Sequence, residues 1–452
     1  MRLRKTITTI VATAILLAGW QLFAVIANQP ELIPSLPRLV RTLCEWLVSG
    51  SFYQSVGATI LRGVLGMSIS FVCAIGMAGL FARFEWVYEL FRPLLAIMRS
   101  IPVISFILLA LIFLNPESIP LMIAFLTMFP LLTENLTRGI LDLRPGLSIM
   151  ARQFHIRRSN VLFQIIYPQL KPFLYSGLAS AAGFGWRAII MGEVLSQCAF
   201  GIGSEMKRAQ NFIAVPELLA WTIVAVFISF FFDKGISKVA DITPKISFAN
   251  EDQTIPAPTL SVLDTKDISY QYGIQHFSHS FQKGIIYGIS APSGKGKTTL
   301  LNLIGDILLP TEGEIHPTRH FGIATIFQQP QLLPHLTAEE NIILPLSSFL
   351  TEEKARRIAQ KHLQEMEMEP FGNRYPKELS YGQQQRIAIA RALAYPSPLL
   401  LMDEPFKGLD EALSHRIIER IREKQMKEER IILFTSHNPD EIRLLADEVI
   451  YL

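Results

Sequence analysis

Apolar residues form long, almost uninterrupted stretches before about residue 235 and short, spaced runs after residue 260. Because a membrane-spanning helix needs roughly 20 mostly apolar residues, the long stretches predict transmembrane helices. We predict six, with the third and fourth joined by a very short turn around Asn115-Pro116. The predicted helices are Ile7–Ala27, Val56–Phe81, Leu94–Leu114, Ile119–Leu136, Leu174–Leu195 and Leu218–Phe232.

The first apolar stretch has a second interpretation, a cleaved signal peptide. The basic residues Arg2, Arg4 and Lys5 precede it, and Val25-Ile26-Ala27 resembles a cleavage site. The stretch is long for the apolar part of a signal peptide, and five more stretches follow it. We therefore predict that the first helix is retained.

The positions of Lys and Arg in the loops predict the orientation. If the N-terminus is inside, only Arg38, Arg41, Lys207 and Arg208 fall in outer loops, and most other loop cations fall inside. Cytoplasmic loops carry an excess of Lys and Arg. We therefore predict that both termini and the soluble part are cytoplasmic.

Four charged residues lie within or near the predicted spans: Arg62, Arg99, Arg187 and Glu193. Such residues are costly in a membrane and usually face a cavity or a partner. Arg187 and Glu193 are six positions apart, so they do not share a helix face and need partners on other helices. Structural pairing, interfacial placement and contact with a solute all remain open for them.

The composition separates a membrane part from a soluble part. Half of the residues are apolar and only 18% are charged, against about 25% charged in soluble proteins, and the charged residues concentrate after residue 260. A net charge of +3 without a basic stripe among aromatics does not indicate nucleic-acid binding. The cysteines, Cys44, Cys73 and Cys198, have no metal-ligand spacing and predict no disulfide framework.

A glycine-rich segment, APSGKGKTT, follows the apolar run Gly284–Ile289 and precedes a segment with helical periodicity. A strand, a glycine-rich turn and a helix form the context of a phosphate-binding loop, whose backbone N–H groups surround phosphate oxygens. Lys297 would neutralise the β- and γ-phosphates, and the Thr298 hydroxyl would bind Mg²⁺. The predicted ATP-binding residues here are Ala291, Pro292, Ser293, Gly294, Lys295, Gly296, Lys297, Thr298 and Thr299.

Four later segments carry complementary chemistry. The buried strand LLLMDE would direct Asp403 at Mg²⁺ and let Glu404 orient or deprotonate the attacking water. Gln328 follows a predicted strand and is placed to contact Mg²⁺ and that water, and His437 follows another and suits a γ-phosphate contact. In LSYGQQQR, Ser380 and Gly382 would begin a helix, whose N-terminus is an anion site.

These motifs resemble those of an ABC transporter ATPase, they occur in the order typical of that family, and they cover nearly all of residues 260–452. The resemblance implies a Walker A loop with Lys297 and Thr298, a Q-loop at Gln328, and a Walker B motif with Asp403 and Glu404. It also implies that Ser380, Gly382 and Gln383 close on ATP bound by another subunit, and that His437 is the switch histidine. The D-loop would be Gly408-Leu409-Asp410, and Tyr272 would stack on adenine, with Tyr270 as the competing candidate.

The motifs depart from the family pattern in three places. Ala291 replaces the first Walker glycine, Tyr381 replaces the first signature glycine, and Lys407-Gly408 stands where Ser-Ala is frequent. An alanine at 291 costs roughly 1–2 kcal/mol if its backbone needs a positive φ and nothing otherwise. We expect an active ATPase.

The membrane part resembles permeases of the nitrate/sulfonate/taurine importer group over most of residues 30–235. Segments such as GWRAIIMGEVLSQ carry this resemblance, as does the predicted inner loop at residues 137–172. That loop resembles the coupling segment of importer permeases, with Ala151 retained, His155 in place of a glycine, and Pro168 thirteen residues later. We expect an apolar helix there that ends at Tyr167-Pro168.

We predict two domains: a six-helix permease of the type I importer kind at residues 1–244 and an α/β P-loop NTPase of the ABC type at residues 260–452. The stretch 245–259, with two prolines and no helical period, is the predicted linker and would act as a semi-extended spacer.

The predicted function is ATP-driven import of a small solute across the bacterial inner membrane by a homodimer, with ATP and Mg²⁺ as cofactors. An extracytoplasmic binding protein would deliver the solute, which the resemblance suggests is a sulfonate, taurine, nitrate or a pyrimidine vitamin precursor. An exporter usually has roughly 300 residues and long cytoplasmic helices before its ATPase, unlike this chain. A non-transporting, membrane-anchored ATPase is the third hypothesis, and the full set of catalytic residues argues against it.

Overall fold

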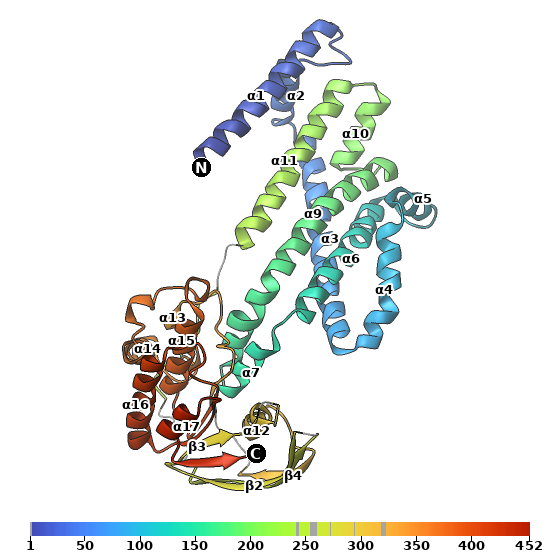
Figure 1. Cartoon of the computed structure of the whole chain (residues 1–452). Helices are drawn as coiled ribbons and strands as arrows, with labels where there is room; N and C mark the ends of the chain where they lie inside the picture. Colours follow the sequence, from blue (N-terminus) through green and yellow to red (C-terminus); the bar gives the residue numbers. More distant parts are fainter. Residues whose placement is uncertain (1, 241–243, 254–259, 272, 293, 318–321) are drawn as a thin grey trace. The chain divides into compact units, whose positions relative to one another are not determined.

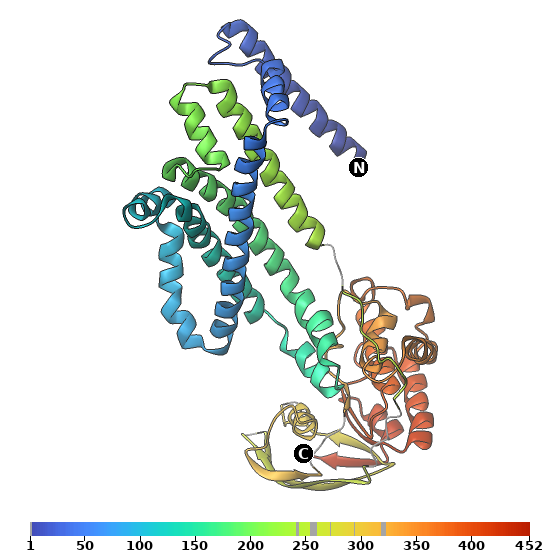
Figure 2. The same ribbon diagram turned by 180° about the vertical axis from the view of Figure 1, so that it is seen from behind.

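The computed structural model describes residues 2–240, 244–253, 260–271, 273–292, 294–317 and 322–452. The chain forms two compact units (Figures 1 and 2). One comprises Met1–Leu143 with Leu170–Thr243, and the other comprises Arg144–Gln169 with Pro244–Leu452. The predicted inner loop therefore belongs largely to the second unit.

The first unit is helical. Its elements are α1 (Arg2–Ala27), α2 (Leu36–Trp46), α3 (Gly50–Arg83), α4 (Glu85–Ser100), α5 (Val103–Phe113), the 3-10 turn η1 (Pro116–Ser118), α6 (Ile119–Leu141), most of α9 (Tyr167–Ser196), α10 (Ile202–Asn211) and α11 (Val215–Ala240). Helices α3, α6 and α9 lie alongside one another in both views (Figures 1 and 2).

Small residues allow α3 to pack closely against its neighbours. The buried residues of α3 recur every three or four positions. From the start of the helix to Ala78 they all have small side chains, as at Gly63, Gly66, Ser70 and Ala74. A Cβ on Gly66 would lie 2.6 Å from the Cβ of Ala124 in α6. Small residues at this spacing are the usual means by which membrane helices approach each other.

Among the described residues, four helices are long and apolar enough to cross a membrane: Gly50–Arg83, Pro116–Leu141, Arg158–Ser196 and Val215–Val239. These correspond to the predicted second, fourth, fifth and sixth spans. The predicted third span is not one continuous helix, because α4 and α5 meet at an angle of 94°. The predicted first span lies in α1, where the apolar part found is the shorter Val11–Ala27.

Pro102 explains the break in the third span. Proline lacks an N–H group and forces the preceding residue out of the helical region. Ile101 accordingly has an extended conformation, with φ −72° and ψ 130°, and Pro102 precedes the first residue of α5. If the α4–α5 pair is one broken span, the described residues contain up to five.

The second unit contains two sheets. The antiparallel sheet has the order β2 (Ile274–Gln282), β1 (Val262–Tyr270), β4 (Glu312–His316). The parallel sheet has the order β5 (Ala324–Ile326), β6 (Leu399–Asp403), β7 (Ile431–Thr435), β3 (Ile286–Ser290), β8 (Glu448–Tyr451). All residues of β6 and β7 are buried, as their continuous apolar sequences predict for central strands of a parallel sheet.

Helices complete this unit. They are α7 (Pro145–Gln153), α8 (Arg158–Asn160), α12 (Lys297–Ile304), α13 (Ala338–Leu346), α14 (Glu352–Glu365), α15 (Tyr381–Ala394), α16 (Glu411–Glu428) and α17 (Pro439–Leu445), with 3-10 turns η3 (Glu369–Phe371) and η4 (Pro376–Glu378). The parallel sheet contributes to two apolar clusters, one of which contains α12. Because β3, β6 and β7 are parallel neighbours, the polar residues just after them meet at one edge of the sheet.

The expected end of the inner-loop helix at Tyr167-Pro168 is wrong. A π-helical stretch, η2 (Val161–Ile166), leads directly into α9, which continues to Ser196. A proline ring clashes with the preceding turn of an α-helix. The wider π-helical turns before Pro168 relieve this clash, and the chain stays helical.

The described part of the predicted linker, residues 245–253, is extended and hydrogen-bonded to the second unit. Ala249 N donates to Ser347 O at 3.0 Å and Gln253 N donates to Phe349 O at 2.9 Å. The Asn160 amide also donates to Ser247 O at 2.8 Å. Residues 254–259 lie outside the described residues, so the predicted domain boundaries stay predictions.

Candidate functional site

The phosphate-binding loop connects β3 to α12, as the sequence predicts. Gly294 and Gly296 have φ of +81° and +88°, and a Cβ on Gly296 would lie 2.6 Å from Gly273 O. The buried Lys297 amine donates to Ala291 O at 2.6 Å, which holds this side chain along the loop. Among the residues that the structure describes, Ala291 is not one of those with a positive φ.

Asp403, the last residue of β6, is held by two hydroxyl groups. Thr298 Oγ1 donates to Asp403 Oδ2 at 2.9 Å, and Thr435 Oγ1 donates to Asp403 Oδ1 at 2.8 Å. Burial raises the pKa of the Asp403 carboxyl, and the hydrogen bonds from Thr435 and Thr298 oppose that shift. The structure thus brings the predicted Mg²⁺ ligands Thr298 and Asp403 together.

Glu404 follows directly and has the left-handed backbone conformation, with φ +50°. This conformation costs energy for a non-glycine residue and is often found at functional sites. Its amide donates to Thr435 Oγ1 at 3.1 Å. Its carboxylate oxygens lie 3.0 Å from His437 Nε2 and 3.1 Å from Lys407 Nζ.

Positive groups keep the Glu404 carboxylate ionised. Burial would raise its pKa, but hydrogen bonds from Lys407 and Gln328 and the charges of Lys407 and His437 outweigh burial and lower it. A cavity of about 490 Å³ surrounds this carboxylate. Its lining residues are Gln328, Glu404, Lys407, Ser436, His437, Asn438 and Glu441.

The predicted signature begins α15. Ser380 caps this helix and accepts a hydrogen bond from Gln383 N, while the Gln383 side chain accepts one from Ser380 N at 2.9 Å. A Cβ on Gly382 would lie 2.7 Å from Gly408 O, so only glycine fits there without a shift. The N-terminus of α15 therefore has the geometry of the predicted anion site.

Tyr381 and Gly408, two residues that differ from the family pattern, lie against each other in the structure. The Tyr381 hydroxyl donates to Gln328 O at 2.7 Å, so the signature tyrosine is attached to the predicted Q-loop of the same chain. Gly408 has φ +79°, and a Cβ there would lie 2.8 Å from the Tyr381 ring.

Two predicted residues, Ser293 and Tyr272, lie outside the described residues. The competing candidate Tyr270 ends β1. Sequence reasoning missed Thr435, because only the pairing of Asp403 with Thr435 across β6 and β7 shows that they meet. It also missed the contact of Lys407 with Glu404, although a spacing of three residues was a usable signal.

The predicted coupling segment packs into the core of the second unit. Gln153, which is 4% exposed, donates through its amide to Gly305 O at 2.5 Å and accepts from Thr325 Oγ1 at 3.2 Å. Phe154 is fully buried, with its ring 5.1 Å from that of Tyr395. His155 has φ +45° at the position where the resembling pattern has glycine.

Arg391 connects three parts of this region. It is buried on α15, donates to Pro330 O and Gln331 O at 2.9 and 2.8 Å just after Gln328, and lies 5.4 Å from the Phe154 ring. Burial lowers the pKa of its guanidinium to about 10, so Arg391 stays charged at neutral pH. The coupling segment, the predicted Q-loop and the signature helix therefore meet at one side chain.

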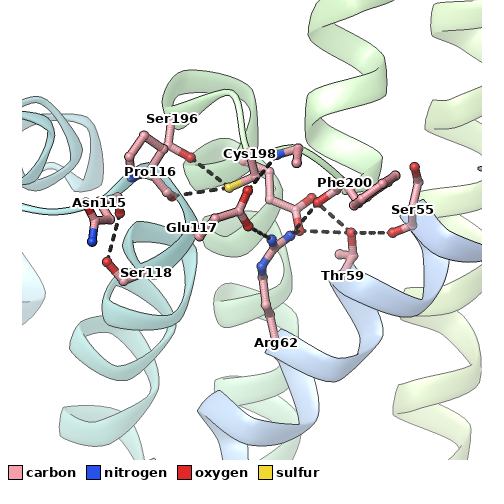
Figure 3. A network of polar contacts seen from close by, with 12 residues as sticks. Ser55, Thr59, Arg62, Asn115, Pro116, Glu117, Ser118, Ser196, Cys198 and Phe200 are labelled. Atoms are coloured by element: carbon pink, nitrogen blue, oxygen red, sulfur yellow. Dashed lines mark hydrogen bonds and ion pairs between the residues drawn. The ribbon is translucent and has the colours of Figure 1, made fainter.

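In the helical unit, Glu193 has partners on other elements, as its position predicts. Figure 3 shows Thr59, Arg62 and Glu117 of this polar network. It is fully buried and accepts hydrogen bonds from Thr59 Oγ1 at 2.9 Å, Arg62 at 2.7 Å and Gly203 N at 3.0 Å. Arg62 also pairs with Glu117 at 2.5 Å, so α3, η1, α9 and α10 are joined. Arg99 pairs with Glu134.

We expect Glu193→Ala to destabilise the full chain by about 3 kcal/mol, because breaking a buried ion pair leaves the remaining polar groups without compensation. Thermal unfolding in detergent measures the loss. Glu193→Gln should lose less because it keeps the shape and some hydrogen bonds, and the exposed Glu217→Gln is the matched control. Equal unfolding temperatures for Glu193→Ala and the control would contradict this role.

A phosphate-binding loop, a carboxylate pair after a parallel strand and a capped signature helix define a nucleotide-binding cassette of the P-loop class. The family model described as ABC transporter matches residues 274–407. The model described as binding-protein-dependent transport system inner membrane component matches residues 68–233.

An uncharacterized ABC transporter ATP-binding protein of Methanocaldococcus jannaschii is 34% identical over 40% of this chain and 85% of its own length. The chain belongs to the ABC transporter family. An Fe(3+) ions import ATP-binding protein of Rhizobium etli and a glucose import ATP-binding protein of Saccharolobus solfataricus are each 35% identical, over 40% and 38% of this chain. The chain spans 54% and 52% of the length of these two relatives.

Proposed function

We propose that this chain is the permease and the ATPase of an ATP-driven importer for a small solute in the bacterial inner membrane. The observation that carries the proposal is the presence, in one chain, of a match to binding-protein-dependent permeases and of an ABC cassette. The contacts of Glu404, Asp403 and Lys297 support hydrolysis by that cassette.

The residues at the sheet edge suit γ-phosphate hydrolysis. Glu404 accepts the proton as the water oxygen attacks the γ-phosphorus, the bond to the bridging oxygen of ADP breaks, and phosphate is released. His437 and Gln328 orient the water and the γ-phosphate, and Lys297 neutralises phosphate charge. Thr298 and Asp403 would hold Mg²⁺, which prefers such oxygen ligands and supplies further charge neutralisation.

A second copy of the chain is the proposed partner. In the family arrangement that the sequence resembles, Ser380, Gly382 and Gln383 act on ATP bound to the other subunit. Since each chain carries one permease and one ATPase, a homodimer provides two complete sites. We place the ATPase and both termini in the cytoplasm, lipid around the helices, and an extracytoplasmic binding protein as the source of the solute.

Reconstitution tests this function. The purified full chain in proteoliposomes should hydrolyse ATP and accumulate at least one probe from a panel of methanesulfonate, taurine, nitrate and hydroxymethylpyrimidine when the cognate binding protein is supplied. Glu404→Gln vesicles are the control for accumulation that does not need hydrolysis. ATP hydrolysis with net efflux of the probes would favour an exporter, and hydrolysis without any flux would favour a membrane-anchored ATPase.

We expect Phe154→Ala to lower solute uptake at least tenfold while ATP hydrolysis changes less than threefold. Loss of a buried aromatic side chain removes several kcal/mol of packing. Here the lost contacts are those of the Phe154 ring with Tyr395 and with the Arg391 guanidinium. The ratio of uptake to hydrolysis in proteoliposomes measures the coupling. The exposed Phe163→Ala in the same segment is the matched control; an unchanged ratio in Phe154→Ala would contradict the prediction.

A further inference from the structure

Residues 404–407 form a turn that brings the side chain of Lys407 back to Glu404. The Lys407 amide donates to Glu404 O at 3.2 Å, and Lys407 Nζ lies 3.1 Å from Glu404 Oε2. A backbone hydrogen bond and an ion pair thus join the same two residues. Lys407 stands where a serine is frequent in the resembling family, and a serine hydroxyl carries no charge.

Both oxygens of the Glu404 carboxylate have a partner. His437 Nε2 lies 3.0 Å from Oε1, and Lys407 Nζ lies 3.1 Å from Oε2. The terminal torsion of a glutamate side chain is broad, so a partner at one oxygen leaves the plane of the carboxylate free to turn. Partners at both oxygens fix that plane. Lys407 therefore limits how the carboxylate is directed within the cavity that surrounds it.

The backbone that carries Lys407 is fixed to the signature helix α15. Gln385 is fully buried on α15 and donates through Nε2 to Pro405 O at 3.1 Å. Phe406 is buried in the core of the same unit. Because the two residues before Lys407 are held in this way, its side chain starts from a fixed point, from which its ammonium reaches Glu404.

The ion pair bears on the direction of the carboxylate more than on folding stability. The Lys407 side chain is 51% exposed, and an ion pair this exposed contributes little to the free energy of folding. Catalysis is more sensitive to position, because displacing a reacting group by about 1 Å can lower a rate about a hundredfold. Loss of the Lys407 charge should therefore change the rate of hydrolysis and leave the unfolding temperature unchanged.

We propose that Lys407 is a positioning residue for ATP hydrolysis, which together with His437 holds the Glu404 carboxylate in the orientation that accepts a proton from the attacking water. The inference rests on the proposed role of Glu404 as proton acceptor and adds a residue outside the predicted site. Lys407 itself exchanges no proton and forms no contact with the nucleotide. Its effect therefore depends on Glu404 and falls on kcat, with KM for ATP unchanged.

Steady-state ATP hydrolysis by the full chain in nanodiscs tests this role. Lys407→Met removes the charge and keeps the length of the side chain. It should lower kcat at least tenfold, with KM for ATP within threefold of the wild type and an unchanged unfolding temperature. Lys407→Arg keeps a cation and should regain at least half of the wild-type kcat. The matched control is Lys361→Met, which removes an exposed lysine paired with Glu365 at 3.8 Å on α14 and should hydrolyse ATP like the wild type.

A double-mutant cycle shows whether Lys407 acts through Glu404. In single-turnover hydrolysis, Lys407→Met should lower the rate at least tenfold when Glu404 is present and less than twofold in the Glu404→Gln background. A tenfold loss in both backgrounds would overturn the inference. So would an unchanged or raised kcat in Lys407→Met, a loss confined to KM, or Lys407→Arg as slow as Lys407→Met.

The same measurements separate this inference from the proposed function. Wild-type turnover by Glu404→Gln would remove the proposed proton acceptor, and the role of Lys407 would fall with it. An inactive Glu404→Gln together with a fully active Lys407→Met would leave the proposed hydrolysis intact and overturn the role of Lys407 alone.

Discussion

Glu404→Gln should lower ATP turnover of the full chain at least about a hundredfold, the usual scale for loss of a general base. The amide keeps the size of the side chain but cannot accept the proton of the attacking water. Lys297 and the loop backbone remain, so ATP should still bind, and the bound nucleotide should trap two chains in a closed dimer. Phosphate release, ATP retention and cysteine cross-linking between chains measure these three effects.

The exposed Glu419→Gln on α16 is the matched control and should retain wild-type turnover. Hydrolysis by Glu404→Gln at the wild-type rate would remove Glu404 from the proposed role. Weak ATP binding together with slow hydrolysis would instead indicate that the substitution damages the whole site.

Lys297→Ala should nearly eliminate hydrolysis, whereas Ala291→Gly should change ATP affinity less than tenfold. Lys297 supplies the charge that neutralises the phosphates, and its side chain is buried whereas that of Lys295 in the same loop is exposed. Ala291 takes part in the described loop through its carbonyl oxygen, which glycine also has. Since its φ is not positive, its Cβ causes no left-handed strain.

ATP affinity from fluorescent-nucleotide titration and turnover from phosphate release measure this pair of variants. Lys295→Ala, in the same loop but exposed, is the matched control for loss of a lysine. A large gain of activity in Ala291→Gly over a nearly inactive wild type would show that the alanine impairs the loop.

The sequence predicts the second unit better than the first, for a physical reason. Strands such as Leu399–Asp403 are continuous apolar runs that end in charged residues, and this pattern identifies both the strand and the site at its end. The sequence of a membrane helix indicates the ends of the helix less clearly, because apolar residues continue across a point where the helix breaks. Pro102 and Pro168 have opposite outcomes, a sharp bend and a continued helix, and only the surrounding turns decide between them.

The candidate site shows the same limit. Motif order identifies Lys297, Asp403, Glu404 and His437 because each follows an element of the sheet. The hydroxyl of Thr435 and the guanidinium of Arg391 join the site through strand register and helix packing, which bring together residues distant in the chain. Such contacts leave no pattern in a single sequence.

The contact between Tyr381 and Gly408 makes the cost of changing one position during evolution depend on the other. The alanine frequent in related cassettes would bring its methyl group 2.8 Å from the tyrosine ring if Tyr381 were still present. The contact therefore makes the alanine more costly while the tyrosine is present than after the tyrosine is lost. Replacing Tyr381 by glycine removes the contact with the ring, but the positive φ of Gly408 would still strain an alanine, so exchanging both residues lowers the penalty of the alanine without removing it.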